Sequence, residues 1–522
     1  MDVTTRTPED WLPILTQRLD DGAERINSLR SYTNGTSPLP ELNANNQPNW
    51  EKVQERARTN YGSRVVTAKT ERMKVISFKI GNPADPEYDK EKVEKYMAIG
   101  RRIWRDNRFA LQVDDALDAA ATCGRGYMLL GQDPTSKLAV VTAEKPEFLY
   151  ATSDPVETWK SRAAIKVWRD LDEGMDFAVV WAPNSRQKFA RAMESDEGIT
   201  FTTFSGGWAP LGPAEASTER VPVSVLENKD GKGDFEHVIN LIRRIELGIL
   251  HRLAIAANQA FRQRMMSGKF PKVDPETGLD IDYNTLYEAG PGTIWVQPEG
   301  TTLTETQAVD LRQLLDAVKE DIKELAAITQ TPMNALIPDS ANQSAEGAME
   351  AREGVILKAR ESIERVSFAI NVAFAEAIRL EAPEFDMTVE VTWALPQLAT
   401  LSERASAASQ MKASGVPFHT IQADVFGKTD EEIAEMEFWL AQEQLALAAG
   451  AASLEDTGPK VLSPEELISR ANAMGVFIRA GAKPESAAEM AGLKGLEFLE
   501  NVVSTSVKTV ERPEAAAPAL TE

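Results

Sequence analysis

Two long stretches of the chain carry an uninterrupted helical pattern, and they constrain the fold more than any other feature of the sequence. Residues 235–267 contain no proline, and apolar side chains recur there in steps of three and four residues. Residues 304–330 repeat this spacing. A helix of about 30 residues extends about 45 Å. The sequence therefore predicts two long helices over these ranges, the second starting with a capping box at Thr304.

The segment between these two helices is short and broken by turn residues. Gly268 and Pro271 end the first helix, and a strand-like run follows at 292–297. Helices joined by so short a segment are expected to run antiparallel, as a rod with a small knob at one end. An ordinary helical bundle would give the same apolar stripes, so the pattern alone leaves both arrangements open.

The two helical stretches also differ in charge. The first carries a run of arginines, whereas the second carries more carboxylates than cations. Such a difference suits a ring in which the basic side of one subunit meets the acidic side of the next, a contact that closes by rotation. The predicted subunit contacts are Arg243, Arg244, Arg252, Asp316, Glu320 and Glu324.

A loop and a third long helix follow. Two prolines prevent a continuous helix over residues 331–344, and this segment contains no Lys or Arg. A helix is then predicted over 345–380, with Gly347 and Gly354 near its start. Glycine costs roughly 1 kcal/mol in a helix interior relative to alanine, so a kink or a close contact is expected there.

The N-terminal part of the chain, residues 1–234, mixes helices and strands. An amphipathic helix is predicted over 8–31, and a later helix ends at Gly124, where the chain turns into a strand. Runs of β-branched and aromatic residues separated by turn residues predict further strands. These predicted strands are 74–80, 138–142, 163–168, 177–181 and 199–204.

The C-terminal part is predicted to be mostly helical. After a strand at 386–393, residues 398–500 are rich in Ala and Glu, and residues 501–522 are expected to form a disordered tail. The sequence thus predicts an α+β protein that is mostly helical.

Composition limits the chemistry that the chain can support. It has 57 Lys and Arg against 80 Asp and Glu, a net charge of −23, which argues against ordinary duplex binding through phosphate contacts. A single cysteine excludes an intrachain disulfide and a zinc site built on paired thiolates. The sequence shows neither a signal-peptide apolar region nor a run long enough for a membrane helix. These features predict a soluble, acidic protein of a reducing cytoplasm.

The catalytic and nucleotide-binding motifs that the sequence partly matches are each incomplete. Residues 426–429 (FGKT) end like a phosphate-binding loop, but Gln422 stands where that motif requires glycine. Gly124 and Gly126 lack the third glycine of a dinucleotide fingerprint and are better explained by a tight turn. Three scattered histidines are too few for most metal or triad chemistry. The sequence therefore predicts no catalytic, cofactor or metal site.

Several short stretches, taken in order, resemble the portal proteins of tailed bacteriophages with long non-contractile tails, especially those of actinobacterial hosts. The resemblance spans about residues 10–440. The stretches that carry it are IWRDNRF (103–109), GRGY (124–127), VPVSVLEN (221–228), LAAITQTP (325–332), NQSAEG (342–347) and VTWALP (391–396).

The resemblance implies a portal-type subunit divided into wing, stem, clip and crown. The implied parts are a wing at 1–234, a first stem helix at 235–267, a clip at 268–303, a second stem helix at 304–330, a tunnel loop at 331–344, a kinked helix with the returning wing strand at 345–397, and a helical crown at 398–500. Residues of the tunnel loop expected to meet DNA are Thr331, Asn334, Ser340, Asn342, Gln343 and Ser344.

The resemblance also implies a structural role. Such proteins form rings, usually of twelve subunits, at one capsid vertex; the ring is the channel for double-stranded DNA and joins head to tail. Implied partners are the terminase ATPase, major capsid and scaffolding proteins, and head-completion or adaptor proteins, with assembly in the host cytoplasm and without cofactor or membrane. Two alternatives stay open: another ring-shaped virion or adaptor protein without the kinked helix and tunnel loop, and an enzyme with a helical core.

Overall fold

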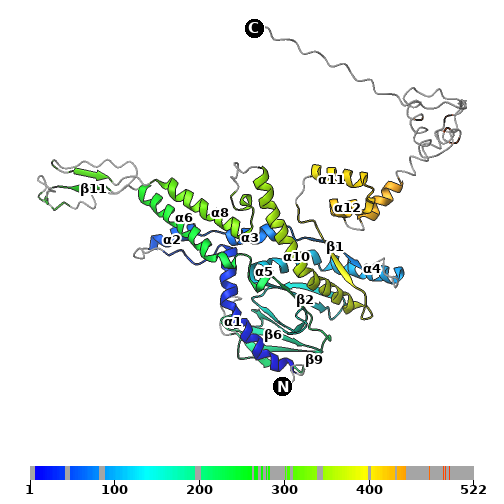
Figure 1. Ribbon diagram of the computed structural model, residues 1–522. Coiled ribbons are helices and arrows are strands. Elements are labelled where there is room, and N and C mark those ends of the chain that lie inside the picture. The colour runs from blue at the N-terminus through cyan, green and yellow to red at the C-terminus, as the bar shows by residue number, and fades with distance from the viewer. Residues whose placement is uncertain are drawn as a thin grey trace, which may run out of the picture. The chain divides into compact units, whose positions relative to one another are not determined.

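Figure 1 shows the protein as a computed structural model. The chain divides into two compact units, Met1–Ala434 and Glu435–Glu522, and the first contains the elements that position the candidate site. The structure describes residues 6–41, 48–81, 89–193, 201–260, 310–337, 345–397, 401–428 and 432–442, with short pieces between 264 and 305 and single positions at 470, 486, 488 and 493.

Helices come first along the chain. The Thr7 hydroxyl accepts a hydrogen bond from the Asp10 amide, and the Asp10 carboxylate accepts one from the Thr7 amide, so a capping box begins the first helix. This helix confirms the prediction for 8–31. The helices of the N-terminal part are α1 (Pro8–Asn34), α2 (Pro48–Ala57), α3 (Tyr61–Thr70), α4 (Lys90–Asp106) and α5 (Phe109–Cys123).

The strands lie in antiparallel sheets. One sheet has the order β10-β2-β3, a second has the order β4-β5-β6-β7-β8 with β9 beside β7, and β1 pairs with β13 from the far end of the first unit. The predicted strands at 74–80, 138–142, 163–168 and 177–181 are confirmed. The strands are β1 (Val75–Ile80), β2 (Arg125–Gln132), β3 (Ala139–Glu144), β4 (Leu149–Ser153), β5 (Ser161–Asp170), β6 (Met175–Ala182), β7 (Ser185–Ala192), β8 (Ala209–Pro210), β9 (Glu215–Ala216), β10 (Val223–Glu227) and β13 (Val389–Trp393).

Gly124 ends α5 and allows the chain to turn into β2. Its φ is +91°, in the left-handed region, and a Cβ atom there would lie 2.1 Å from the Gly231 carbonyl oxygen. Both facts require glycine. The tight turn predicted at Gly124 is therefore confirmed.

Aromatic rings form the centre of the largest core. The Phe374 ring lies 4.6 Å from both the Phe78 and the Phe109 ring centroids, and Trp104 packs edge-on against it at 5.9 Å. Phe374 is part of α10 (Ala345–Glu381), a long helix that packs against β10, β2 and β13. The core therefore joins residues far apart in the sequence. We call the first unit's residues 6–228, together with α10 and β13, the body.

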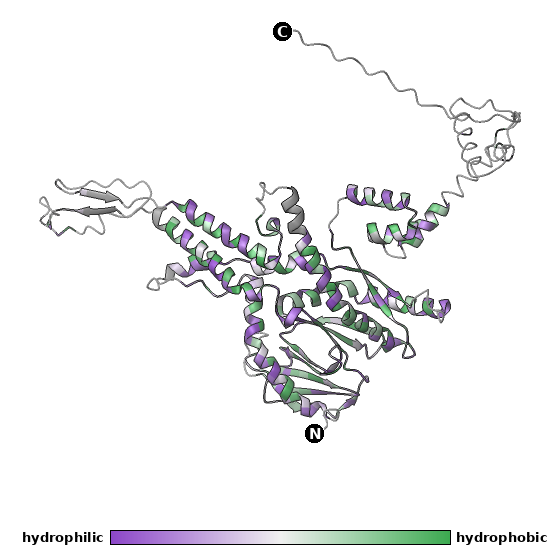
Figure 2. Cartoon of the chain, in the orientation of Figure 1, coloured by the Kyte–Doolittle hydropathy of each residue, from purple (hydrophilic) through white to green (hydrophobic). Residues whose placement is uncertain are grey.

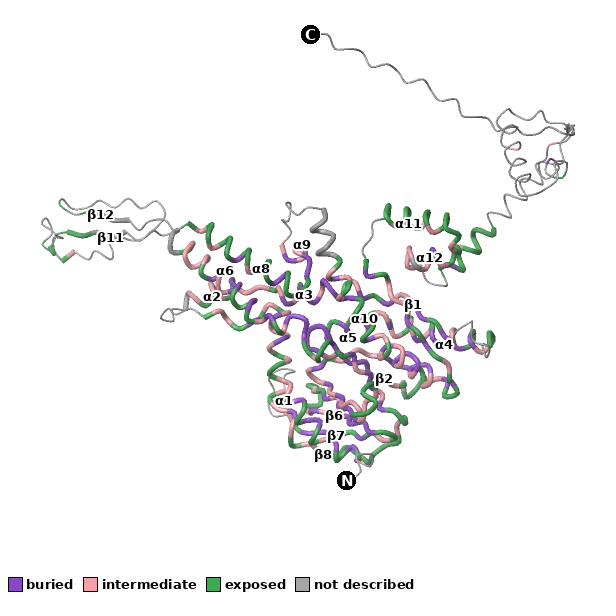
Figure 3. Tube along the Cα trace, viewed as in Figure 1, coloured by how far each residue is buried: buried purple, intermediate pink, exposed green. Residues whose placement is uncertain are grey.

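A second core lies between α1 and the larger sheet. Trp11, Leu15 and Leu19 come at four-residue spacing on one face of α1 and pack against Ile165 and Val180 of the sheet. Figure 3 shows buried residues concentrated in this part and around α5 and α10.

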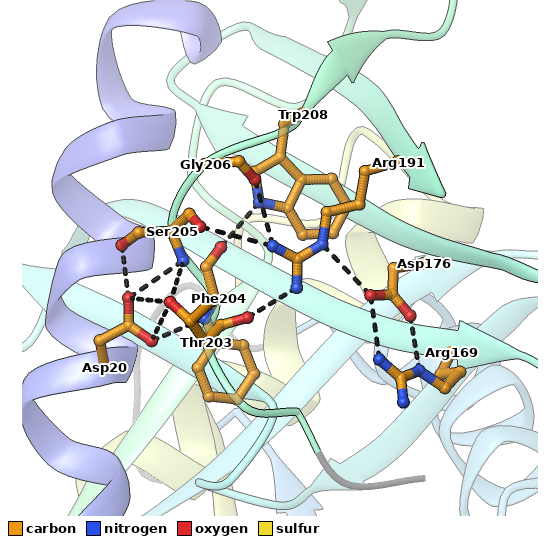
Figure 4. Close-up of polar contacts among 9 residues, drawn as sticks. All are labelled: Asp20, Arg169, Asp176, Arg191, Thr203, Phe204, Ser205, Gly206 and Trp208. Carbon is orange, nitrogen blue, oxygen red and sulfur yellow. Dashed lines mark hydrogen bonds and ion pairs between the residues drawn. The ribbon is translucent and has the colours of Figure 1, made fainter. Parts of the chain in front are cut away.

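The predicted strand at 199–204 is wrong where it can be checked. Residues 199 and 200 lie outside the described residues, and residues 201–204 form no strand. Instead, Asp20 of α1 accepts hydrogen bonds from the Phe204 amide at 2.6 Å and the Ser205 amide at 3.0 Å (Figure 4). The carboxylate thus accepts hydrogen bonds from backbone amides that, in a strand, would donate to the neighbouring strand.

Two buried arginines hold the same segment from the sheet side. Arg169 and Arg191 both bind Asp176, whose side chain is fully buried, and the Arg191 guanidinium also donates to the Thr203 carbonyl at 2.6 Å (Figure 4). The ring of Trp208 lies 4.6 Å below that guanidinium. These contacts fix the irregular segment without any ladder of strand hydrogen bonds.

The two long helices are shorter than predicted. A 3₁₀ turn at Glu236–Val238 leads into α6 (Ile239–Ala260), and the second helix is α8 (Leu311–Thr329). The predicted helical ends are wrong at 264–267 and at 304–305, because β11 (Arg264–Ser267) pairs with β12 (Thr302–Glu305) as antiparallel strands. Residues 306–309 lie outside the described residues.

The predicted capping box at Thr304 is wrong for the same reason. Thr304 lies in β12, and Asp310 caps α8 by accepting a hydrogen bond from the Arg312 amide at 2.9 Å. The strand-like run predicted at 292–297 lies outside the described residues.

The remaining elements follow α8. A single turn, α9 (Met333–Leu336), precedes α10, and α11 (Leu401–Ala413) and α12 (Phe418–Phe426) follow β13. Gly427 of the FGKT stretch ends α12 in the left-handed conformation, so it serves as a helix cap. Residues 432–442 are helical. Among the described residues, no helix is both long and apolar enough to span a membrane.

Candidate functional site

The pair formed by α6 and α8 is the element most unlike the rest of the fold. Figures 1 and 2 show the two helices side by side, each with alternating apolar and polar residues. One apolar seam joins them, and three- and four-residue spacing puts its members on the facing sides. The buried residues of this seam include Ile242, Ile245, Val318, Ile322 and Leu325. We call this element the stem pair.

Gly248 brings the two helices of the stem pair close together. A Cβ atom at this position would lie 2.8 Å from Cγ2 of Val318, closer than real side chains approach. A glycine in the interior of α6 costs about 1 kcal/mol of helix propensity. The close approach of α8 is the physical reason for accepting that cost.

Arg244 binds carboxylates of its own chain. Its guanidinium lies 2.9 Å from Asp321 and also donates to Glu324, both on α8. The hydrogen bond to Glu324 is the largest effect that raises the pKa of Arg244 above its ordinary value. Two of the predicted subunit-contact residues, Arg244 and Glu324, are therefore brought together within one subunit.

The other predicted contact residues are spread over the stem pair. Arg243 donates to the Tyr32 hydroxyl at 2.7 Å, so it ties α6 to α1. Arg252 is half-buried and its Nε atom is buried without a hydrogen-bond partner. Asp316 and Glu320 are exposed on α8, and Glu320 binds Lys323 one turn away.

A buried ionic cluster lies where the stem pair begins. Lys69 of α3 and Asp234, just before α6, are 3% and 5% exposed, and Nζ of Lys69 lies 2.8 Å from Oδ2 and 3.0 Å from Oδ1 of Asp234. Asn228 donates to the same carboxylate at 3.0 Å and accepts from Lys69 at 3.3 Å. Because buried charges are costly unless paired and hydrogen-bonded, this geometry fixes the start of α6 against α3.

Lys358 of α10 links the same cluster to the end of α8. Its ammonium lies 4.0 Å from the Asp234 carboxylate and donates to the Thr329 carbonyl at 3.2 Å. Burial is the largest effect on Lys358 and lowers its pKa. We call Lys69, Asn228, Asp234 and Lys358 the stem-base cluster; it joins the body to both helices of the stem pair.

A buried glutamate ties α6 to the segment between α1 and α3. Glu246 is 1% exposed, and its Oε1 atom accepts from the Ser37 hydroxyl and the Thr59 amide, both at 3.0 Å. The carboxylate therefore satisfies donors of an irregular segment that would otherwise be buried and unpaired.

The segment after α8 is only partly described. Gln330 ends α8 in the left-handed conformation, and Thr331 is buried, with its hydroxyl accepting from Thr329 at 2.8 Å. Asn334 lies in the single turn of α9. The predicted loop residues Ser340, Asn342, Gln343 and Ser344 lie outside the described residues.

The segment is followed by α10, a single helix over Ala345–Glu381. Nothing is described of the side chains at the start of this helix. At Gly354, a Cβ atom would meet Cβ of Gln330 at 3.8 Å, an ordinary contact, so this glycine is not required by close packing.

Two of the buried charged residues, Glu246 and Lys69, have a signal in the sequence. Glu246 lies four residues after Ile242 and three before Ile249, inside the apolar stripe of α6. Lys69 lies four residues after the buried Val65. In both cases a charged residue occupies a position of the helix that its neighbours predict to be apolar, which indicates a buried charge. Asp234 and Lys358 do not occupy such positions.

The described residues offer little reactive chemistry. Among them, no group of three or more His, Cys, Asp and Glu side chains is placed to hold a metal ion. Burial raises the pKa of the Cys123 thiol to about 12, so the thiolate that nucleophilic chemistry needs is strongly disfavoured.

Comparison with known proteins finds similar proteins over most of the chain. Two curated relatives, both named portal protein, are 25% identical over 439 residues (Mycobacterium phage D29) and 23% identical over 436 residues (Mycobacterium phage L5); each alignment covers 78% of this chain and 83% of the relative. A solved structure of the neck of an empty GTA particle aligns with a TM-score of 0.38 and 12% identity, over 77% of this chain and 92% of that chain.

A family model also matches most of the chain. The model described as phage portal protein, SPP1 Gp6-like, matches residues 14–446, which is most of the chain. The chain therefore belongs to the phage portal protein family of the SPP1 Gp6-like type, as its short sequence stretches predicted.

Proposed function

We propose that this protein assembles into a ring, of twelve subunits in the capsid, that forms the channel for double-stranded DNA at one capsid vertex and the connection between head and tail. The observation that carries the proposal is the stem pair: two antiparallel helices with one apolar seam, fixed at their base by a buried ionic cluster. The side of α8 away from the seam is exposed, which suits an element completed by neighbouring subunits.

The charges of the chain suit a channel through which DNA slides. Tight contacts between cations and phosphates would slow a moving duplex, and the segment 331–344 contains no Lys or Arg. We propose that this segment is the tunnel loop and narrows the channel through Thr331, Asn334, Ser340, Asn342, Gln343 and Ser344. A net charge of −23 gives weak guidance that is independent of DNA sequence.

The proposed parts and partners follow the family. Residues 1–234 with the strand near 386–395 would form the wing, residues 268–303 the clip, residues 345–397 the kinked helix and returning strand, and residues 398–500 the crown. The terminase large subunit would supply ATP hydrolysis, and the major capsid, scaffolding and head-completion or adaptor proteins would meet the ring during assembly in the host cytoplasm. In this proposal the chain performs no catalysis.

Electron microscopy of the purified protein tests the ring. Negative-stain images and native mass spectrometry are expected to show closed rings with an axial hole. A compact monomer at every concentration, even with capsid and scaffolding proteins present, would contradict the proposal and favour the helical-core enzyme. Rings without DNA packaging in a reconstituted assembly would favour another ring-shaped virion or adaptor protein.

A deletion tests the tunnel loop separately. Removal of residues 341–343 is expected to leave rings intact but to reduce packaging or retention of the genome, because the channel would be wider. Removal of residues 196–198, which also shortens the chain by three, is the control and should leave both unchanged. Normal packaging and retention after the first deletion would contradict the loop's role.

A further inference from the structure

A cavity of about 610 Å³ lies in the body and has no part in the proposed channel. It opens between the start of α1, strands β5 and β10, and the later part of α10. Its apolar wall is made of Trp11, Leu130, Val221, Val223 and Val372. The volume is in the range of sites that bury an organic ligand or a few residues of peptide.

Cations and indole rings surround this cavity in pairs. The Trp11 ring lies 5.1 Å from the Arg6 guanidinium and 5.0 Å from that of Arg162. The Trp159 ring lies 4.8 Å from the Lys160 ammonium and 5.5 Å from the Arg220 guanidinium. In a chain with a net charge of −23, such a gathering of cations at one cavity stands apart from the rest of the composition.

Two of these cations already have carboxylate partners. Arg220 binds Glu376 at 2.7 Å, and Lys160 binds Glu157. Among the lining carboxylates, Asp154 accepts hydrogen bonds from the amides of residues 156 and 157. Glu376 and Asp154 are therefore committed to other donors, whereas Glu219, which also lines the cavity, is exposed.

The other two cations have carboxyls nearby but not in close contact, since Arg6 helps to lower the pKa of Asp10 and Arg162 that of Asp154. Within the described part of the chain, neither Arg6 nor Arg162 lies within ion-pair distance of a carboxylate, and Nε of Arg162 is buried without a hydrogen-bond partner. A buried donor without an acceptor is unfavourable. A guanidinium binds a carboxylate or a phosphate in a bidentate manner.

The rim of the cavity distinguishes between these two kinds of anion. Val156 is 87% exposed, Trp159 is 40% exposed, and Phe368 of α10, 54% exposed, packs edge-on against Trp159 with the ring centroids 5.4 Å apart. An exposed apolar rim beside a cationic cavity fits a peptide that offers both a carboxylate and an apolar side chain, and is of no use to a free phosphate.

We propose that this cavity is a docking site for a short acidic segment of a partner protein. A carboxylate of the segment binds Arg162 and Arg6, and a neighbouring aromatic or aliphatic side chain enters the apolar part beside Trp11. The proposal does not depend on the ring or the channel, because all the residues that form the site belong to one subunit.

Selection from a random peptide library tests the site. Displayed twelve-residue peptides are selected on the full-length protein with an excess of soluble Arg162→Gln protein as competitor. The enriched peptides are expected to place Asp or Glu next to Leu, Phe or Trp. A fluorescein-labelled copy of an enriched peptide is expected to bind wild type and to lose at least tenfold in affinity when its acidic residues become amides.

Variants of the protein locate the binding. Arg162→Gln and Arg6→Gln are each expected to weaken binding of that peptide at least fivefold. Arg186→Gln removes the same charge from an exposed arginine of β7 that binds Glu215, and should leave binding unchanged. Thermal unfolding checks that the variants are folded, because Arg6 and Arg162 both lie against the ring of the core residue Trp11.

Three results would overturn the proposal. One is the absence of enrichment, and another is a set of enriched peptides that lack acidic residues or that bind both arginine variants as tightly as wild type. The third concerns the chain's own residues 1–5, which include Asp2 and Val3 beside Arg6 in the sequence. If binding appears only after these residues are removed, the occupant is the chain itself and no partner docks there.

Discussion

The body and the stem pair use apolar side chains in different ways. In the body, α10 is surrounded by β10, β2, β13 and α4, and Phe374 contacts rings from three directions. In the stem pair, α6 and α8 meet along one seam, and α8 exposes apolar side chains such as Leu315 and Ile328. Figure 3 shows the contrast between the buried body and the exposed side of α8. The body can therefore be stable by itself, whereas the stem pair depends on its base and on whatever covers it.

The largest effect is expected in the body. Phe374→Ala should lower the free energy of unfolding by about 4 kcal/mol, because it removes a fully buried ring from a core of aromatic neighbours. Urea unfolding followed by circular dichroism measures the change. Phe368→Ala on the same helix is the control; Phe368 is 54% exposed, so its loss should cost far less. Equal losses would mean that α10 is not centred in the core.

The stem-base cluster is expected to give the next largest effect. Lys69→Met leaves the buried Asp234 carboxylate with Lys358 at 4.0 Å as its cation, and should cost about 3 kcal/mol. Lys74→Met removes a lysine of the neighbouring strand region whose partner, Asp114, is partly exposed, and should cost little. Unfolding by urea compares the two variants. A neutral Lys69→Met would show that the cluster does not hold the stem pair to the body.

A glycine-to-alanine substitution stabilises an ordinary helix, but in the seam of the stem pair it is expected to destabilise the protein. Gly248→Ala should destabilise by about 1 kcal/mol, because the new Cβ meets Val318 and overpacking outweighs the gain in helix propensity. Gly22→Ala in α1, where the nearest atom is 3.6 Å away, should stabilise by up to about 1 kcal/mol.

A second substitution checks the cause of the Gly248 effect. The double variant Gly248→Ala with Val318→Ala should lose less than the sum of the two single variants, because the smaller residue makes room for the new methyl group. Thermal unfolding measures all four proteins. Simple additivity would mean that the two positions do not touch.

Glu236, where the body meets α6, is expected to make the free energy of unfolding depend weakly on pH in the acid range. Burial by itself would raise the pKa of Glu236, but the hydrogen bonds from Arg25 and from the Gly233 amide outweigh it, so the pKa is lowered from 4.5. A lowered pKa means that Glu236 contributes stability above pH 4.5, which is lost as the pH falls through the folded-state value. Glu236→Gln should therefore flatten the acid part of the curve of unfolding free energy against pH. An unchanged curve would contradict this role.

Sequence patterns predicted local elements well and contacts between distant residues poorly. Helix α1, the turn at Gly124 and the strands β1, β3, β5 and β6 followed from periodicity and turn residues, whereas β4, β7 and β10 were not predicted. The ends of the long helices did not, because pairing of β11 with β12 replaced a helical pattern that continued through both segments. The strand predicted near residue 204 failed because Asp20, far away in the sequence, binds its amides.

The candidate site shows the same division. The stem pair and the family followed from the sequence, whereas the stem-base cluster could not, because it depends on α3, α10 and the start of α6 meeting in space. The predicted pairing of arginines with carboxylates between subunits was a statement about charge alone. Charge does not tell whether a partner is in the same chain, and Arg244 finds Asp321 and Glu324 on its own α8.

The smallest effect on stability and assembly is therefore expected from a substitution of Arg244, an exposed residue of the stem pair. The side chain is exposed and its partners are intramolecular, so Arg244→Gln should leave both the unfolding midpoint and the number of subunits in the assembly unchanged. Glu320→Gln, which removes a charge bound only to Lys323 on its own helix turn, is the matched control for a change on the same surface. Native mass spectrometry at low and at high salt measures the assembly. If Arg244→Gln dissociated the assembly and Glu320→Gln did not, the Arg244 guanidinium would have to exchange its own carboxylates for those of a neighbour on assembly. The body would then be held by contacts within one subunit, whereas the surface of the stem pair would make its contacts only in the assembled ring.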